Sequence, residues 1–145
     1  MDELLKGRRS PFTGLIISGG EPLLQLDSDL LDQLSSFYEW IDIETNGTVP
    51  FTMSKPDNVF LSCSPKLATI KLTNADWYKV LIPDKQDLLR TVEHLAKPTR
   101  IYVQPVEVGG YESAITQENI RKCLALCSAR GYRLSLQLHK VVGVR

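Results

Sequence analysis

The stretch Leu15-Ile16-Ile17-Ser18-Gly19-Gly20-Glu21-Pro22 decides the fold class of this chain. Its apolar, β-branched beginning predicts a buried strand, and the double glycine predicts a tight loop at the end of that strand. Because glycine has no side chain, the backbone of the loop can approach a ligand closely. Glu21 adds a carboxylate that can pair with an amine, and Pro22 fixes the local backbone. The loop is therefore suited to a small zwitterion rather than to a phosphate.

Length and composition place the chain in a broad class. With 145 residues we expect a single domain over residues 1–145. Lys plus Arg and Asp plus Glu both number 17, so the charge balance gives no reason to expect a nucleic-acid partner. No apolar run approaches the ~20 residues that a bilayer requires, and residues 1–6 lack signal-peptide features. We expect a cytoplasmic protein without a membrane partner.

The cysteines do not suggest a metal site. Cys63, Cys123 and Cys127 are an odd number, which fits poorly with a disulfide framework. Cys123 and Cys127 share an apolar stripe at helical spacing with Ile120 and Leu124, so we expect this stripe to face a core. No nearby Cys or His completes a zinc or iron–sulfur spacing. We therefore expect no metal ligand, and we assign no catalytic residue.

Strands and helices alternate along the chain. Strands are expected over residues 15–18, 41–45, 58–63, 77–82, 100–105 and 132–138. Helices are expected from a cap at Asp27 or Ser28, from a cap at Asp84 to a stop before Pro98, and from a cap at Thr116 to about Arg130 with Gly131 at its end. This alternation predicts parallel strands with crossover helices, in an open sheet or part of a barrel. Six strands and three helices leave some crossovers as loops.

Polar residues follow five of the expected strands. They occupy residues 18–22, 44–48, 62–66, 104–107 and 137–140. In a parallel barrel the carboxyl ends of the strands converge on one face, where ligands bind. One polar residue after a strand is more often part of a turn, but five such segments indicate a site.

The segment Ser18-Gly19-Gly20-Glu21-Pro22 resembles the methionine-amine motif of radical S-adenosylmethionine (SAM) enzymes. Further segments narrow the resemblance to the 7-carboxy-7-deazaguanine synthase family, over nearly the whole chain. They are residues 44–48 (ETNGT), 64–66 (SPK), 77–81 (WYKVL), 102–105 (YVQP) and 133–140 (RLSLQLHK). The resemblance implies an α/β fold: a partial (β/α) barrel of the radical SAM type, with mostly parallel strands, three main crossover helices and the first strand missing. The chain would be the C-terminal part of that barrel.

The resemblance also implies ligand contacts. Gly19, Gly20 and Glu21, with the adjoining Pro22, would hold the amino and carboxylate end of SAM. The other implied cofactor contacts are Glu44, Asn46, Ser64, Pro65, Lys66, Gln104, Pro105, Val106 and Glu107, with Lys66 as the counter-charge. Ser18, His139 and Arg145 would contact the pterin substrate. A hydrogen-bonded histidine at the edge of the core is an equally weighted interpretation of His139.

The implied reaction converts 6-carboxy-5,6,7,8-tetrahydropterin to 7-carboxy-7-deazaguanine with release of ammonia, on the route to queuosine and other 7-deazapurines. The family uses SAM, Mg²⁺ and a [4Fe-4S] cluster held by a C-x3-C-x2-C loop. The chain has no such loop, and its three cysteines cannot replace it. We therefore expect the cluster and magnesium ligands to be absent from this chain, and the chain alone to be inactive.

Several interpretations stay open. The chain can be one half of a split enzyme completed by an N-terminal half polypeptide, a truncated product, or a catalytically dead module that binds SAM or the pterin. A homodimer partner is a further expectation, because homologues often form dimers. An unrelated α/β nucleotide-binding protein is less favoured, because neither a Walker loop nor a dinucleotide-binding loop is present.

Overall fold

The structure is a computed structural model, and it describes residues 14–144. In these residues one sheet has six strands: β1 (Gly14–Ile17), β2 (Trp40–Thr45), β3 (Val59–Cys63), β4 (Trp77–Ile82), β5 (Ile101–Pro105) and β6 (Arg133–Leu134). Each strand pairs in parallel with the next one along the chain, so the order in the sheet is the order in the sequence. The sheet is not closed, and the predicted partial barrel is confirmed.

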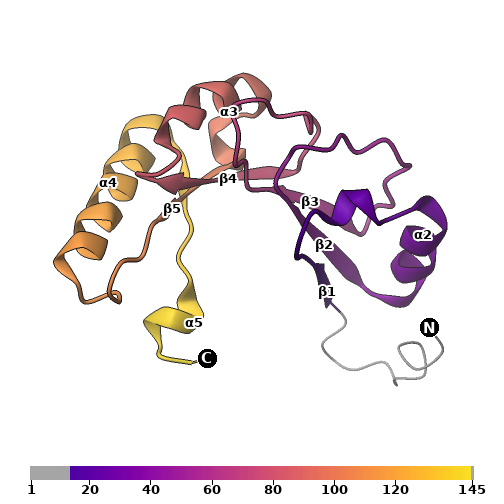
Figure 1. The fold of residues 1–145 in the computed structure, drawn as a ribbon, viewed down its shortest axis with the longest axis horizontal. Helices are drawn as coiled ribbons and strands as arrows, with labels where there is room; N and C mark the ends of the chain where they lie inside the picture. Colours follow the sequence, from indigo (N-terminus) through magenta and orange to yellow (C-terminus); the bar gives the residue numbers. More distant parts are fainter. Residues whose placement is uncertain (1–13, 145) are drawn as a thin grey trace.

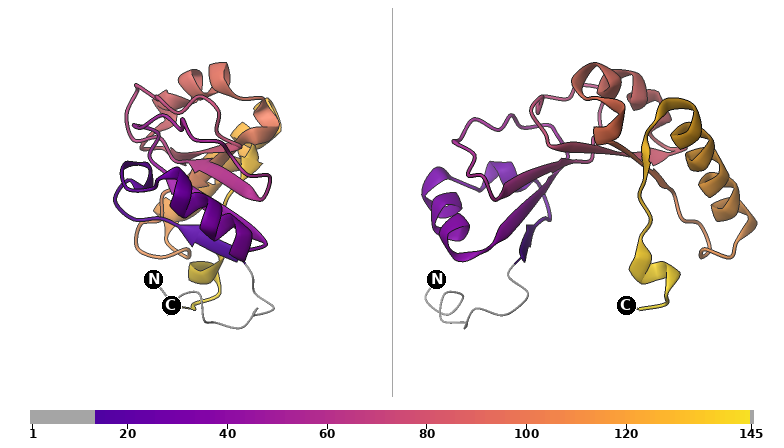
Figure 2. Two further views of the ribbon diagram at one scale, coloured as in Figure 1. Left: turned by 90° about the vertical axis from the view of Figure 1, so that its right-hand side faces the viewer. Right: turned by 180° about the vertical axis from the view of Figure 1, so that it is seen from behind.

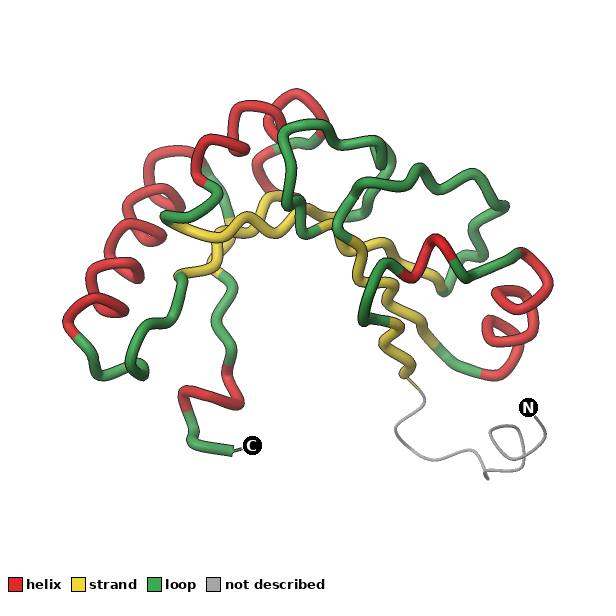
Figure 3. Tube along the Cα trace, in the orientation of Figure 1, coloured by secondary structure: helices red, strands yellow, loops and turns green. Residues whose placement is uncertain are grey.

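Helices connect three of the five strand pairs in the described chain. They are α2 (Ser28–Phe37) before β2, α3 (Leu89–Leu95) before β5 and α4 (Ala114–Arg130) before β6. Short helical turns are η1 (Pro22–Leu24), η2 (Gln86–Leu88) and η3 (Pro98–Arg100), and α5 (Leu138–Val141) follows β6. Residues 46–58 and 64–76 connect β2 to β3 and β3 to β4 as loops, which Figure 3 draws in green. The predicted three crossover helices are confirmed.

The sheet curves into an arch with the crossover helices α2, α3 and α4 on its outer side (Figure 1). The view from behind in Figure 2 shows the same arrangement, with β1 in one leg of the arch and α5 below the other. The inner, concave side of the sheet has no helix layered on it among the described residues. Side chains on this concave side are therefore available to form a site.

The alternation of side chains along each strand assigns the two faces of the sheet. Outward positions such as Ile43, Leu61 and Val80 are fully buried under the helices and loops of the convex side. Burying each such side chain contributes about 1.5–3 kcal/mol to folding. The positions between them are polar in the central strands, as at Glu44 and Lys79, and these side chains face the concave side.

Two of the predicted helix caps are wrong. Asp27 does cap α2, because its carboxylate accepts from the backbone N–H of Leu30 at 2.8 Å. The cap of α4 is Ser113 rather than Thr116, whose buried hydroxyl bonds the Val108 carbonyl instead. Asp84 caps no helix, because the chain enters α3 through the turn η2 without a side-chain cap. Gly131 ends α4 in the left-handed conformation, with φ of 72°, as predicted.

The apolar stripe expected on α4 is partly wrong. Cys123 is fully buried and Cys127 partly buried, but Leu124 is 47% exposed. The inward face of the helix instead carries Thr116 and Asn119, and the Asn119 amide donates to the Val106 carbonyl at 2.9 Å. Burial raises the pKa of Cys123 to about 12, so this thiol behaves as a small apolar group rather than as a metal-binding thiolate.

The last strand is shorter than the predicted span of residues 132–138. Pairing with β5 involves Arg133 and Leu134, and one more hydrogen bond joins the Ser135 N–H to the Val103 carbonyl at 3.0 Å. The chain then leaves the sheet and forms α5. No helix in residues 14–144 has both the length and the apolar character that crossing a bilayer requires.

Candidate functional site

A pocket of about 400 Å³ lies on the concave side, at the carboxyl ends of the strands. Its lining includes eight residues that the sequence predicted for a site: Ser18, Gly19, Gly20, Glu44, Asn46, Ser64, Lys66 and Gln104. Thr45, Ser62, Lys79, Leu81 and Gln137 complete the lining. The structure therefore brings together predicted residues that lie at or just after the ends of four different strands.

The glycine loop after β1 leaves open space beside its backbone. Gly19 and Gly20 have φ of 91° and 50°, a backbone region that residues other than glycine rarely adopt. A Cβ atom added at either residue would meet no atom within 4 Å. The two residues thus expose bare backbone to the pocket, as the sequence predicted.

Glu21 stands behind this loop rather than in the pocket. The residue is 7% exposed, and its Oε1 accepts the Thr45 hydroxyl at 2.6 Å and the Leu23 N–H at 3.3 Å. Its Oε2 accepts the Asn46 N–H at 2.8 Å. Glu21 is absent from the residues that line the pocket, and donors within the chain make three hydrogen bonds to its carboxylate. Glu21 instead fixes the glycine loop to the end of β2.

The loop after β2 is tied to both of its neighbours. The Gly47 N–H donates to the Thr45 hydroxyl at 3.1 Å, and the Thr48 N–H donates to Asn46 Oδ1 at 2.9 Å. The Ser64 N–H, just after β3, donates to the Thr45 carbonyl at 2.8 Å. A Cβ atom at Gly47 would lie 2.7 Å from the Cys63 sulfur, so this turn packs too closely for a side chain. These bonds give the three loops one rigid arrangement.

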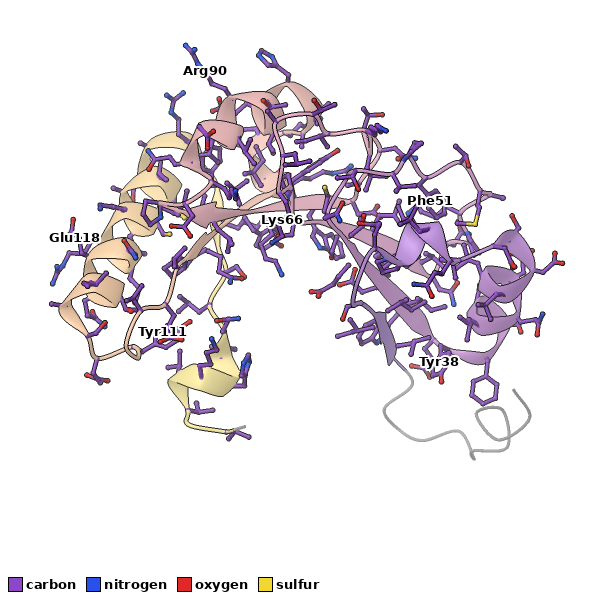
Figure 4. The ribbon with its side chains drawn as sticks, viewed as in Figure 1. Tyr38, Phe51, Lys66, Arg90, Tyr111 and Glu118 are labelled. Carbon is purple, nitrogen blue, oxygen red and sulfur yellow. The ribbon has the colours of Figure 1, made fainter. Side chains whose placement is uncertain are left out.

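Two lysines bring positive charge to the pocket. Lys66, labelled near the crown of the arch in Figure 4, is exposed, and its Nζ lies 3.4 Å from the Ser64 hydroxyl. Lys79 comes from β4, and its Nζ lies 3.5 Å from Glu44 Oε1. The pocket can therefore hold a ligand that carries a carboxylate as well as hydrogen-bond donors.

A second pocket, of about 280 Å³, continues the first one along the concave face and shares Glu44, Ser62 and Lys79 with it. It is further lined by Asp42, Trp77, Tyr102 and Ser135. Burial is the main cause that raises the pKa of Asp42, while the hydrogen bond from Ser62 lowers it. Asp42, Trp77, Tyr102 and Ser135 were not predicted as site residues, because the prediction rested on the residues at the strand ends. The period-two alternation of polar residues within the strands is the signal that would have found them.

Other predicted residues lie away from the two pockets. Pro22, Pro65 and Pro105 are buried, and Val106 is absent from the residues that line either pocket. Glu107 instead accepts from the Lys140 ammonium at 3.1 Å and from the Gly110 N–H at 2.6 Å. These bonds connect the loop after β5 to α5, beside the Tyr111 that Figure 4 labels.

His139 was expected to face the substrate from the end of the last strand. It lies instead on α5, where it is exposed and lines neither pocket. Its interpretation as a histidine at the edge of the core is not supported either, because of this exposure. The chain leaves the sheet after Ser135, which is why the predicted strand does not carry His139 into the hollow. Arg145 lies outside the described residues.

Among residues 14–144, no group of three or more His, Cys, Asp and Glu side chains is arranged to hold a metal ion. The chain's cysteines are Cys63 on β3 and Cys123 and Cys127 on α4. Burial raises the pKa of Cys63 to about 12, which opposes thiolate ligation. These residues do not fit an iron–sulfur cluster, whereas the glycine loop and Lys66 do fit an amino-acid end such as that of SAM.

No family model matches the chain, but individual proteins do. The chain is 31% identical over 137 residues to 7-carboxy-7-deazaguanine synthase of Bacteroides thetaiotaomicron. This match covers 93% of the chain and 67% of that protein. The synthases of Bordetella pertussis and Bradyrhizobium diazoefficiens are 33% and 35% identical, over 90% of this chain and 59% of each. The chain thus spans about three fifths to two thirds of the length of these relatives.

A solved structure agrees with these matches. A crystal structure of QueE from Escherichia coli superposes with a TM-score of 0.66 at 25% sequence identity. The match covers 86% of this chain and 56% of that one. The curved parallel sheet is therefore shared with that protein.

Proposed function

The chain belongs to the 7-carboxy-7-deazaguanine synthase family, and we propose that it forms the wall of a radical SAM active site that binds SAM and the pterin substrate. The reaction would convert 6-carboxy-5,6,7,8-tetrahydropterin to 7-carboxy-7-deazaguanine with release of ammonia, in the synthesis of queuosine and other 7-deazapurines. The observation that carries the proposal is the pocket in which bare glycine backbone, Lys66 and the polar ends of four strands converge.

Different residues of the first pocket would contact different parts of the ligands. The backbone of Gly19 and Gly20 would hold the methionine end of SAM, and the Lys66 ammonium would balance its carboxylate. Glu44, Asn46, Ser64 and Gln104 would supply polar contacts around the rest of the cofactor, and Ser18 would touch the substrate. Glu21 would act as a positioning residue, since its three hydrogen bonds hold the glycine loop in place.

The radical chemistry needs groups that these residues do not hold. A [4Fe-4S] cluster, together with SAM, would supply the reductive radical chemistry, and the proposed reaction also includes Mg²⁺. Thiolates must hold the cluster, and the three cysteines of the chain are buried or lie in helix α4. We therefore propose that another polypeptide segment supplies these ligands, and that the 145 residues alone are inactive.

The test is reconstitution. The chain is mixed anaerobically with a polypeptide that carries the C-x3-C-x2-C motif, with reductant, Mg²⁺, SAM and the tetrahydropterin. We expect 7-carboxy-7-deazaguanine to form in the mixture and not with either component alone. If a folded complex that binds SAM forms no product, the enzymatic proposal is wrong.

A second candidate is a binding module without chemistry. Two observations favour it. The pocket is lined by glycine backbone and by polar and charged side chains, and the described residues include no cluster of His, Cys, Asp and Glu arranged to hold a metal ion. This candidate predicts SAM binding in calorimetry together with no turnover in the reconstitution. Product formation would rule it out.

A further inference from the structure

Three side chains on neighbouring strands form a hydrogen-bonded chain across the concave face. The Ser62 hydroxyl on β3 lies 2.7 Å and 2.9 Å from the two carboxylate oxygens of Asp42 on β2. The Trp77 indole N–H on β4 donates to the same hydroxyl oxygen. Ser62 is 6% exposed, yet it lines both pockets. The hydroxyl is thus held from both sides at the point where the pockets meet.

The chemistry of the three groups fixes the direction of each hydrogen bond. An indole N–H can only donate, so the Ser62 oxygen must accept from Trp77. The single hydroxyl proton of Ser62 then goes to Asp42, whose ionised carboxylate can only accept. One lone pair of the Ser62 oxygen is left. The hydroxyl can therefore offer a ligand an acceptor but no donor.

The groups around Ser62 reinforce this polarity. Glu44 and Asp42 lie on the same face of β2 and line the same pocket. The Lys79 ammonium is drawn toward Glu44, 3.5 Å away. Asp42 and Glu44 thus add acceptors beside Ser62, and a ligand part that lies against Ser62 must bring donors.

We propose that Ser62 is a specificity-determining acceptor for a planar heterocycle with N–H donors, and that Trp77 and Asp42 are its positioning residues. A 2-aminopyrimidinone edge, such as that of a pterin, has this chemistry. The inference rests on the proposed function, because it takes the concave hollow as the substrate site. What is new is the identity of the residues that select the substrate, and the statement that they select it by accepting hydrogen bonds from it.

Two fluorescent probes test the polarity. Pterin-6-carboxylate carries an exocyclic amino group, and lumazine-6-carboxylate carries an oxygen in its place. We expect the wild-type chain to bind the pterin about tenfold more tightly, since the lumazine oxygen would face an acceptor that it cannot pair with. The titration follows the fluorescence of the probe itself.

Ser62→Ala is the decisive variant. It removes the hydroxyl oxygen that would accept from the ligand, so neither probe meets this acceptor. We expect the preference for the pterin probe to fall to about twofold or less. Ser36→Ala is the matched control, because Ser36 is an exposed serine of α2 and lines neither pocket. It should keep the wild-type preference, and far-ultraviolet circular dichroism should show both variants folded.

The outcomes separate this inference from the proposed function. SAM binding is measured on the same samples. If SAM binds but wild type shows no preference between the probes or binds neither, the selection by Ser62 is wrong while the cofactor site stands. A preference that survives in folded Ser62→Ala also overturns the inference. If the preference behaves as expected but SAM does not bind, the inference stands and the cofactor proposal fails.

Discussion

The Thr45 hydroxyl donates a 2.6 Å hydrogen bond to the Glu21 carboxylate, across 24 positions of sequence. This bond, with the one from the Asn46 N–H to the same carboxylate, joins the glycine loop after β1 to the turn after β2. Both partners are buried. The shape of the pocket rim therefore depends on a side chain that does not itself line the pocket.

Replacing Glu21 should loosen this rim. In Glu21→Ala the Thr45 hydroxyl and the Asn46 N–H lose their acceptor, which should lower the free energy of unfolding by about 1–3 kcal/mol. SAM binding should weaken as well, because the glycine loop is no longer fixed. Urea unfolding and calorimetry measure the two effects. Glu39→Ala, at an exposed residue, is the control and should change neither. Unchanged stability in Glu21→Ala would contradict the positioning role.

Lys66 should contribute to ligand binding mainly through its charge. The side chain is exposed, so Lys66→Met should leave stability within about 0.5 kcal/mol of wild type. Affinity for SAM should fall several-fold at low salt and by less at high salt, where the ammonium is screened. Calorimetry at two ionic strengths measures this. Lys71→Met, at another exposed lysine, should bind like wild type. A loss that does not depend on salt would contradict a charge effect.

Asp42 should make stability depend on pH. Its pKa in the folded chain is raised above 3.8, first by burial and also by Glu44 and Asp76, against the lowering effects of Ser62 and Lys79. A raised pKa means that the folded state holds the proton more tightly than the unfolded state does. The stability from this group is therefore present below pH 3.8 and is lost as pH rises through the folded pKa.

The measurement is the stability of wild type minus that of Asp42→Asn, because other titrating groups then largely cancel. Urea unfolding from pH 3.5 to pH 7 should show this difference falling as pH rises. A difference that rises with pH would show that Asp42 is stabilised in its ionised form instead.

Glu107 should behave in the opposite sense. The Gly110 N–H and the Lys140 ammonium lower its pKa, so its contribution is present at neutral pH and is lost as pH falls through the folded pKa. Glu107→Gln should therefore speed amide hydrogen exchange in α5 at pH 7, since α5 loses its ion pair with the loop after β5. Glu112→Gln, at an exposed residue of the same loop, is the control. If the amides of α5 exchange at the same rate in wild type and in Glu107→Gln, the ion pair does not hold α5 to the loop after β5.

Much of the fold was predictable because strand and helix periodicities and the punctuating glycines are local signals. All six strands and the three crossover helices were expected from these patterns. The length of β6 was not, because residues 132–138 keep a strand-like pattern while pairing with β5 ends near Ser135. The caps failed for a similar reason. Ser113 and Thr116 can both cap a helix, and both hydroxyls donate to the Val108 carbonyl. Ser113 is the cap because its hydroxyl oxygen also accepts the Thr116 N–H.

The site was predictable at the carboxyl ends of the strands and was missed further back along them. Ser18, Gly19 and Gly20 follow a strand and line the pocket as expected. Asp42 was missed, although its alternation with buried Ile41 and Ile43 places it on the open face. Ser62 lay in the expected polar segment 62–66, but no ligand contact was assigned to it. The direction of Glu21 could not be predicted, because it is set by a partner far away in the sequence.

Calorimetric titration of SAM into wild type, Gly19→Val and Gly110→Val tests the cofactor pocket most directly. Both glycines have φ of 91° and open space around an added Cβ, so the strain introduced by valine is matched. Gly19 lines the first pocket, and Gly110 lies in the loop near α5. We predict binding to wild type and Gly110→Val, and at least about tenfold weaker binding to Gly19→Val, since its side chain would occupy the ligand's space. Equal binding by all three, or no binding by folded wild type, would contradict the account.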